Sequence, residues 1–396
     1  MTERPLNILY AMPGYKPAWR VGGPIQSVAA AAEKLAARGH RVTVFTTNGN
    51  LDQDIDVPLD QPVEVDGVTV WYFRREEPLQ KYLAFAPYLS RSMGFLYAPA
   101  MAAKLDEMMP EFDAVDTQMP FVYPTYAASR AAIRHRVPLF YHQRGNLLDT
   151  HMARRRLKKQ AYIRLLERPV MERATGLIAL SEAEREAFNR EAPDTPAYIV
   201  PNGVDLPASA AGFAERVEQR WGIETDARVI LFLGRMHPWK GPDILLEAFQ
   251  RVHASHPDAV LVMAGVDEAQ VAQRWAGTDK VVFAGVVTGQ DKADLLRRAD
   301  IFALPSEGEG LSMAILESLS HETAVLISPQ CNFAPGDAGL VKPRTVEGFA
   351  EGLSQLLGDP ARTRQMGAAG LALVKQAYTW EAVTDRLVEI YSRKAA

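Results

Sequence analysis

Two glutamates in the stretch 305–320, PSEGEGLSMAILESLS, have residue types and a spacing that suit a ligand site. Glu309 and Glu317 are eight positions apart and follow the apolar run IFAL at 301–304. That run predicts a strand, followed by a glycine-broken loop and an apolar-periodic helix. A loop that leads into a helix presents free backbone N–H groups and the positive end of the helix dipole, which together favour an anion such as phosphate.

The two carboxylates would not bind the phosphate itself, but they accept hydrogen bonds from hydroxyl groups. A nucleotide sugar offers both parts, a phosphate and hydroxyls on its ribose and its sugar. A solvated helix face shows the same spacing, so the pair alone does not decide between the two interpretations. Glu307 in the EGEG segment is a rival, but only Glu309 lies eight positions before Glu317.

Length and composition limit the kinds of protein that the chain can be. A chain of 396 residues predicts two domains of roughly 200 residues each. The net charge of -4 argues against a nucleic-acid binder. The single cysteine, Cys331, excludes an intrachain disulfide and fits a reducing compartment. The first apolar run is too short for a signal peptide or a membrane span, so we expect a cytoplasmic protein.

Two segments of the chain open with the same order of elements. An apolar run at 6–12, a loop with the glycine pair 22–23, an alanine-rich stretch and RVTVFTT predict strand, loop, helix and strand. The order returns at 228–234, with the loop RMHPWKG, a helix from Pro242 to about His256, and AVLVMAG. The fold class is therefore α/β, with two Rossmann-like doubly wound domains and a ligand bound between them.

The boundary between the two domains is predicted from a break in periodicity at 199–212, which contains prolines and an Asn-Gly pair. We expect an N-terminal domain over 1–203 and a C-terminal domain over 204–377. A last helix at 378–396 is expected to pack back on the N-terminal domain.

The second strand–loop–helix unit carries cations in place of the usual phosphate-binding glycines. Neither unit has the Gly-x-Gly-x-x-Gly or P-loop pattern, which disfavours a dehydrogenase or a kinase. Arg235 and Lys240 lie between a strand and a helix start, where a diphosphate would bind, although ordinary surface cations would look alike. In the first unit, Gly22 and Gly23 let backbone N–H groups approach a ligand, or form a plain turn.

The segment PLFYHQRGN at 138–146 predicts a strand with His142 and Arg144 at its carboxyl end. Active sites of α/β proteins lie at that end, so both residues are candidates for a contact with the substrate, while a structural histidine remains the alternative.

No metal site is expected. The histidines lack zinc-ligand spacing. Asp52, Asp54 and Asp56 include the Asp-x-Asp spacing that some transferases use for a divalent metal, but they lie in a segment typical of a solvated loop. The stretch 153–173 carries eight Arg or Lys residues among apolar ones. It fits either peripheral contact with an anionic membrane or a solvated helix.

Taken together, these motifs resemble the retaining glycosyltransferase family four, the glycosyl transferases group one, whose members have the GT-B fold of two domains facing a central cleft. The resemblance covers nearly the whole chain and is carried, in order, by VGGP, RGHRVTVFTT, ALSEAE, VPNGVD, GRMHPWKG and ADIFALPSEGEGLSMAILESLS.

The resemblance implies a role for each matching position. Glu309 would contact the transferred sugar and Glu317 the ribose, while Arg144 and His142 remain alternatives for a further sugar contact. It also implies that the N-terminal domain is on the acceptor side and that the C-terminal domain binds the nucleotide sugar. Ser312 departs from the family, which commonly has glycine there; serine still supplies its N–H, and its hydroxyl is a candidate for the helix cap. The implied donor-binding set is Gly22, Gly23, Arg235, Lys240, Glu309, Gly310, Leu311, Ser312, Met313 and Glu317.

The expected function is retaining transfer of a sugar from a nucleoside diphosphate to a glycan or a lipid-linked saccharide, without a metal or other cofactor. The fixed cations and the helix start would stabilise the leaving diphosphate. The expected pathway is cell-surface polysaccharide synthesis, at the inner face of the membrane. A nucleotide-sugar epimerase of the same fold and a non-catalytic nucleotide-sugar-binding subunit are the alternatives. The donor base, the sugar and the acceptor are not encoded in a recognisable pattern.

Overall fold

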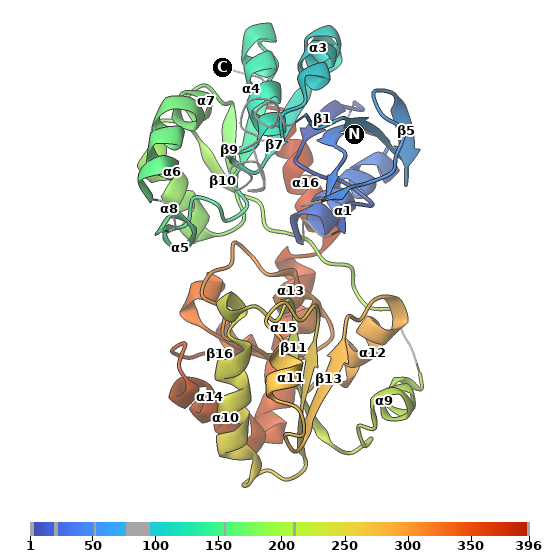
Figure 1. Cartoon of the computed structure of the whole chain (residues 1–396), viewed down its shortest axis with the longest axis vertical. Coiled ribbons are helices and arrows are strands. Elements are labelled where there is room, and N and C mark those ends of the chain that lie inside the picture. Colours follow the sequence, from blue (N-terminus) through green and yellow to red (C-terminus); the bar gives the residue numbers. More distant parts are fainter. Residues whose placement is uncertain are drawn as a thin grey trace, which may run out of the picture. The chain divides into compact units, whose positions relative to one another are not determined.

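The computed structural model describes residues 4–19, 23–50, 53–76, 96–153, 156–208 and 211–393. The chain forms two compact units, the first made of Met1–Asn202 and Trp380–Ala396 and the second of Gly203–Thr379 (Figure 1). These limits differ by one and two residues from the expected ones at 203 and 378. The two segments that connect the units meet in a parallel bridge between Val204 and Thr379.

The first unit is built on an eight-stranded sheet in the order β10-β9-β8-β7-β1-β2-β6-β5. All neighbouring strands are parallel except β5 and β6. β1, β7, β8 and β9 are buried along their whole length, because helices cover both faces of a parallel sheet. The strands are β1 Asn7–Ala11, β2 Arg41–Thr47, β5 Pro62–Val65, β6 Val68–Phe73, β7 Ala114–Gln118, β8 Leu139–His142, β9 Gly176–Ala179 and β10 Ala197–Ile199, with a separate hairpin of β3 Gly49–Asn50 and β4 Gln53–Asp54.

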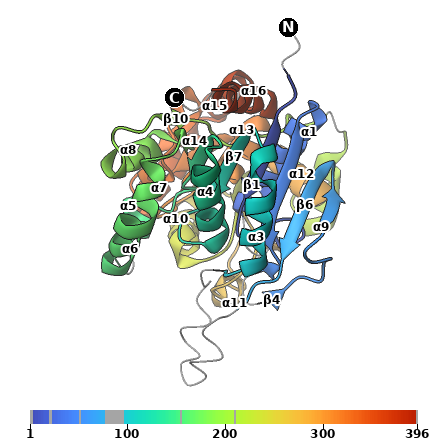
Figure 2. The ribbon, with the colours of Figure 1, turned by 90° about the horizontal axis from the view of Figure 1, so that it is seen from above.

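The helices of the first unit include α16, which comes from the far end of the chain. α16 packs against α1, and α3 and α4 lie side by side in both Figure 1 and Figure 2. The helices are α1 Gly23–Ala37, α3 Pro99–Met108, η2 Met109–Glu111, α4 Tyr123–His135, α5 Asp149–Ala153, α6 Arg156–Tyr162, the π-helix η3 Ile163–Glu167, α7 Arg168–Met171, α8 Glu182–Glu191 and α16 Trp380–Tyr391.

The second unit has a six-stranded parallel sheet in the order β13-β12-β11-β14-β15-β16. α10 packs against α14, and α13 packs against α15. The strands are β11 Arg228–Leu233, β12 Ala259–Ala264, β13 Val281–Gly285, β14 Ile301–Leu304, β15 Ala324–Ile327 and β16 Gly339–Val341. The helices are α9 Phe213–Trp221, η4 Pro238–Lys240, α10 Pro242–His253, α11 Val271–Arg274, α12 Gly289–Arg298, α13 Met313–Ser320, η5 Pro329–Cys331, η6 Gly336–Ala338, α14 Val346–Gly358 and α15 Pro360–Ala377.

Both sheets reverse their strand order at one point, between β1 and β7 in the first unit and between β11 and β14 in the second. Ligands of doubly wound sheets bind outside the carboxyl ends of the strands at such a point. The predicted α/β class with two Rossmann-like units is confirmed. α10 ends at His253 rather than near His256.

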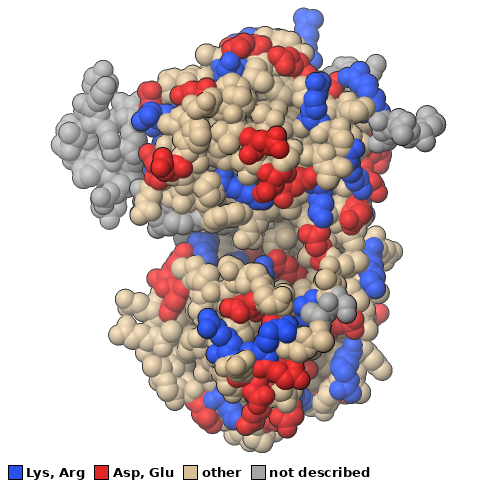
Figure 3. Space-filling view, turned by 90° about the vertical axis from the view of Figure 1, so that its right-hand side faces the viewer, with Lys and Arg blue, Asp and Glu red and all other residues tan. Residues whose placement is uncertain are grey.

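The surface carries both signs of charge. On the face shown in Figure 3, acidic and basic side chains are interspersed over both units. Within the part of the chain that the structure describes, no helix has the length and apolar character needed to cross a bilayer.

Candidate active site

The loops that follow β11 and β14 form the candidate site of the second unit. The two strands pair in parallel, with Ile230 beside Ile301, so both loops leave the same edge of the sheet at the point where the strand order reverses. The first loop leads through η4 into α10, and the second leads into α13. The predicted cations and glutamates lie on these two loops and on α13.

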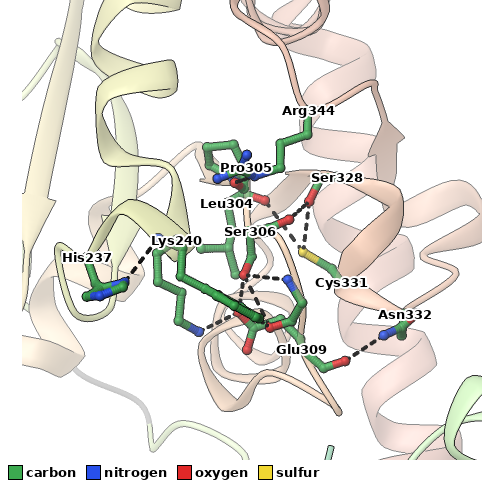
Figure 4. Close-up of polar contacts among 12 residues, drawn as sticks. His237, Lys240, Leu304, Pro305, Ser306, Glu309, Ser328, Cys331, Asn332 and Arg344 are labelled. Carbon is green, nitrogen blue, oxygen red and sulfur yellow. Dashed lines mark hydrogen bonds and ion pairs between the residues drawn. The ribbon is translucent and has the colours of Figure 1, made fainter. Parts of the chain in front are cut away.

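Lys240 and Glu309 come together across the two loops (Figure 4). Oε1 of Glu309 accepts hydrogen bonds from Nζ of Lys240 and from Oγ of Ser306, the latter at 2.5 Å. The two charged side chains are 21% and 10% exposed, so the pair is partly shielded from water but still reachable. An ammonium has three N–H donors, and Lys240 can therefore bind an anion while it holds Glu309.

The backbone of Glu309 is fixed by the loop that follows β15. Its N–H donates to the carbonyl of Gln330 at 3.0 Å, and its carbonyl accepts from Nδ2 of Asn332 at 2.7 Å (Figure 4). Oγ of Ser328 donates to the carbonyl of Ser306 at 2.5 Å. Sequence reasoning missed this loop, because its residues match none of the motifs that indicated a ligand.

A second set of contacts joins the two site loops to each other. Nε1 of Trp239 donates to the carbonyl of Gly308 at 3.1 Å, and the N–H of Glu307 donates to the carbonyl of Trp239 at 2.8 Å. Gly241 has a φ of 70°, and a Cβ at this position would lie 2.4 Å from the carbonyl oxygen of Pro305. Only glycine allows this close approach of the two loops.

Arg344 closes the arrangement from the side of β16. Its Nε donates to the carbonyl of Pro305 and its Nη2 to the carbonyl of Pro238, both at 2.9 Å. One guanidinium therefore holds both loops, and Figure 4 shows it on the side of Pro305 away from Glu309.

The start of α13 lies directly after Glu309. Ser312 occupies the N-cap position, but its hydroxyl makes no cap hydrogen bond, so this candidate cap is not formed. Leu311 and Ser312 are 7% and 8% exposed, whereas Gly310 and Met313 are half-buried. The N–H groups of the first turn have no partner within the helix and remain suited to an anion.

Glu317 lies inside α13, and its Oε1 accepts a hydrogen bond at 2.7 Å from Nζ of Lys292 on α12. The side chain of Glu317 is only 17% exposed, so it is not an ordinary solvated carboxylate.

Arg235 is expected from the sequence to lie beside Lys240 as a second cation for a diphosphate. Its side chain is instead 59% exposed, and its Nη1 lies 3.3 Å from Glu268.

The first unit places His142 and Arg144 at the end of β8. His142 is 3% exposed, its Nε2 lies 3.0 Å from Oδ2 of Asp116, and burial lowers its pKa. Arg144 is half-buried, with a φ of 50° that is unusual for a residue other than glycine. Its Nε donates to Gln118 at 2.7 Å and its Nη1 to Asn202 at 2.8 Å.

The remaining predicted residues are less informative. Gly23 is the exposed first residue of α1, with open space where a Cβ would lie, and Gly22 lies outside the described residues. Asp52 also lies outside them, and Asp54 pairs with Arg75 at 2.5 Å. Within the described ranges, no group of three or more potential metal-binding side chains occurs.

Comparison with protein families decides the class of the protein. The family model for Glycosyl transferases group 1 matches residues 227–359, and that for the Glycosyl transferase 4-like domain matches residues 22–203. The chain is a group 1 glycosyl transferase. Together the two matches include both site loops of the second unit and the strands β7 and β8 of the first unit.

Relatives of this glycosyl transferase include enzymes that act on inositol compounds. The chain is 28% identical to a D-inositol 3-phosphate glycosyltransferase of Kineococcus radiotolerans, over 94% of this chain and 90% of the relative. It is 30% identical to a phosphatidyl-myo-inositol mannosyltransferase of Mycobacterium tuberculosis, over 58% of this chain and 62% of the relative.

Solved structures identify the fold of this glycosyl transferase as GT-B. HepE of Anabaena, in complex with UDP-glucose, matches with a TM-score of 0.73 at 19% identity, over 98% of this chain and 99% of HepE. WaaG, a glycosyltransferase of lipopolysaccharide biosynthesis, matches with a TM-score of 0.70 at 18% identity, over 97% of this chain and 99% of WaaG.

The ALSEAE motif of this glycosyl transferase contains a buried carboxyl group that predicts a dependence of stability on pH. Glu184 is the third residue of α8, whose N-cap is Ser181, and its Oε2 accepts a hydrogen bond from the N–H of Leu180 at 2.9 Å. Burial raises its pKa from 4.5 to about 7. The folded state therefore binds the proton more tightly than the unfolded state, and this group's contribution to stability falls as pH rises from 4.5 to about 7.

We expect Glu184→Gln to be more stable than the parent above neutral pH, by up to about 3 kcal/mol, because the ionised form is no longer buried. The gain in stability of Glu184→Gln over the parent should shrink as pH falls from about 7 to 4.5. Urea unfolding at a series of pH values measures it. The exposed neighbour Glu182 is the matched control, and an equal pH dependence of Glu182→Gln and Glu184→Gln would contradict the assignment.

Proposed function

We propose that this glycosyl transferase moves a sugar from a nucleoside diphosphate to a hydroxyl of a glycan or a lipid-linked saccharide, with retention of configuration and without a metal ion. The pairing of Lys240 with Glu309 at the start of α13 is the observation that carries the proposal. The second unit binds the donor, and the first unit supplies the acceptor side.

The chemistry follows from the charges at this junction. As the glycosidic bond breaks, negative charge grows on the leaving diphosphate, and the Lys240 ammonium and the N–H groups of α13 stabilise it in place of a metal ion. The Glu309 carboxylate accepts hydrogen bonds from the sugar hydroxyls. The acceptor attacks on the face that the diphosphate leaves, and a departing phosphate oxygen takes the acceptor proton.

The relatives support the class of donor and acceptor. HepE was crystallised with UDP-glucose, and the named relatives glycosylate inositol phosphate or phosphatidyl-myo-inositol. We infer that the acceptor is a saccharide or another polyhydroxyl compound, in free or lipid-linked form. WaaG acts in lipopolysaccharide biosynthesis, which supports a role in cell-surface polysaccharide synthesis.

A panel of nucleotide sugars tests the donor. A bound donor stabilises the folded state in proportion to the logarithm of its concentration, so the true donor should raise Tm at the lowest concentration. Release of nucleoside diphosphate, dependent on acceptor and unaffected by EDTA, would support metal-independent transfer. Formation of an epimer without an acceptor would instead identify an epimerase, and donor binding without turnover a binding subunit.

Glu317→Ala should raise the KM for the donor by about tenfold and leave kcat within about threefold, because a ribose hydroxyl contributes binding in both the ground state and the transition state. Initial rates at varied donor concentration measure the split. Glu322→Ala, on the turn after α13, is the control. An unchanged donor KM in Glu317→Ala would rule out the ribose contact.

We further propose that the basic segment 153–173 contacts an anionic membrane surface. Leu157 and Leu165 are 83% and 72% exposed, beside the cations of this segment; residues 154 and 155 lie outside the described residues. Exposed leucines among cations are typical of helices that lie in a lipid interface.

The remaining residues predicted to contact the donor are also part of the proposal. They are Gly22, Gly23, Arg235, Gly310, Leu311, Ser312 and Met313.

In liposome flotation we expect binding to vesicles with anionic lipid and little binding to neutral vesicles. Changing Leu157 and Leu165 together to Glu should reduce the bound fraction by about fivefold or more, since apolar burial and attraction to the surface are both lost. Leu206→Glu, at a residue that is 44% exposed outside the segment, is the control. Binding that does not depend on anionic lipid would contradict the proposal.

A further inference from the structure

A buried carboxylate at the switch point of the first unit has no role in the proposed reaction so far. Asp116 is the third residue of β7, it is 0% exposed, and it pairs in register with Tyr10 of β1. A charge buried in a central strand is costly unless it is hydrogen-bonded and paired with an opposite charge. Its partners therefore indicate what it does.

Three side chains contact this carboxylate, one from its own strand and two from other segments. Nε2 of Gln118 donates to Oδ1 at 2.5 Å, and the hydroxyl of Tyr391 donates to Oδ2 at 2.5 Å. Nε2 of His142 lies 3.0 Å from Oδ2. One carboxylate thus contacts β7, α16 and the end of β8, within the first unit.

Gln118 connects Asp116 to Arg144 by hydrogen bonds to both side chains. An ionised carboxylate only accepts hydrogen bonds and a guanidinium only donates them, so the amide of Gln118 must turn its NH₂ to Asp116 and its oxygen to Arg144. The contacts have that polarity, because Oε1 of Gln118 accepts from Nε of Arg144 at 2.7 Å. The amide has one allowed orientation, and it fixes the plane of the guanidinium.

A second amide completes the support of Arg144. Nη1 donates to Oδ1 of Asn202 at 2.8 Å. Among the residues that the structure describes, the contacts of Arg144 use Nε and Nη1, which leaves Nη2 for a ligand. The φ of 50° turns the chain at this residue, two positions after the end of β8, at the edge of the sheet where ligands of doubly wound proteins bind.

His142 contacts Oδ2 of Asp116, and it is more deeply buried than Arg144. It is 3% exposed with its Nε2 directed at Asp116, and burial lowers its pKa, so it is a neutral packing neighbour of the carboxylate at neutral pH. Arg144 interacts electrostatically with Asp116 without a direct ion pair, and it supplies opposite charge near this buried carboxylate.

We infer that Asp116 is a positioning residue that, through Gln118, orients Arg144 as the substrate-facing group of the first unit, and that Tyr391 of the C-terminal helix holds Asp116 in place. The inference rests on the proposed function, and it selects Arg144 over His142 as the sugar contact. Tyr391 also pairs with the hydroxyl of Tyr10 at 3.0 Å, which anchors α16 to β1 as well as to β7.

A double-mutant cycle on the full chain tests the inference, with release of nucleoside diphosphate from UDP-glucose or GDP-mannose, whichever is turned over, as the readout. We expect Arg144→Gln to lower kcat about 100-fold, Asp116→Asn about 30-fold, and the double variant no more than Arg144→Gln alone, because Asp116 acts through Arg144. A loss of kcat in the double variant equal to the product of the two single losses would overturn the inference. So would a larger loss for His142→Gln than for Arg144→Gln.

Tyr391→Phe separates positioning from folding. We expect about a tenfold loss of kcat with a change in Tm no larger than that of Tyr72→Phe, which removes the hydroxyl of another buried tyrosine, one that donates to the carbonyl of Lys16. Equal activity of the two variants would count against a role for Tyr391.

A spectroscopic signal tests the geometry without a substrate. The Nε–H NMR signal of Arg144 should be protected from exchange in the parent and lose that protection in Asp116→Asn and Gln118→Ala. If the Nε–H of Arg144 stayed protected in both variants, the inference that Asp116 orients Arg144 through Gln118 would be overturned. If no nucleotide sugar is turned over, or if Glu309→Gln keeps full activity, the proposed function fails, whereas a failed cycle in an active enzyme removes only this inference.

Discussion

Glu309→Gln is expected to lower kcat for transfer by about 10³-fold while the protein stays folded. The variant keeps an acceptor for Ser306 but loses the negative charge that we propose lies beside the transferred sugar. The Glu309 side chain is 10% exposed and paired with Lys240, so water screens its charge less than it screens a surface carboxylate. Measurement at saturating donor and acceptor isolates kcat from binding.

Glu307→Gln is the matched control for this prediction. Glu307 lies two positions away on the same loop, its side chain is exposed, and its backbone N–H contributes to the contact with Trp239 that the substitution leaves in place. We expect its kcat to stay within about twofold of the parent, as for most surface changes away from a site. Transfer near the parent rate in Glu309→Gln, or equal losses in both variants, would refute the role of Glu309.

The local part of this site could be predicted from the sequence. The apolar run at 301–304, the glycine-containing loop and the periodic stretch after it give β14 and α13, and Glu309 and Glu317 lie in the loop and in the helix as expected. Such predictions succeed where neighbouring residues decide the structure. The hydroxyl of Ser312 shows the limit, because a residue at the N-cap position does not have to direct its side chain at the helix.

The pairing of Lys240 with Glu309 could not be predicted in the same way. The residues are 69 positions apart and meet because β11 and β14 are neighbours in the sheet. Arg235 lies nearer to the strand in sequence, yet its side chain turns to Glu268. Position in a loop indicates the edge of the sheet on which a residue lies, whereas the direction of its side chain depends on partners from other segments.

Asp116 gave a signal that motif reading did not use. It is a charged residue within AVDTQ, a strand whose every residue is buried. A carboxylate in such a strand indicates a partner, but Tyr391 is 275 positions away and Gln118 is an ordinary polar residue in sequence terms. The network that supports Arg144 is therefore visible only once α16 has been placed against the first sheet.

Lys240→Gln is expected to lower kcat/KM for the donor by about 10³-fold. The variant loses the cation that we propose stabilises the leaving diphosphate, a contribution comparable to that of other charge-stabilising groups in enzymes. It also leaves the Glu309 carboxylate without its ion pair, and that unpaired charge would repel the diphosphate. Initial rates at low donor concentration measure the loss.

Restoring the charge without the geometry distinguishes these two effects. Lys240→Arg keeps the cation and a pairing with Glu309, but the donors of a guanidinium lie in one plane on a longer side chain. They would therefore meet Glu309 and a diphosphate in a different geometry from the ammonium. We expect it to recover donor affinity more than turnover. Lys375→Gln makes the same substitution at an exposed position on α15 and should leave both constants within about twofold. If Lys240→Gln lost no more than Lys375→Gln, the diphosphate would have to be stabilised by other groups, which would contradict the role proposed for Lys240.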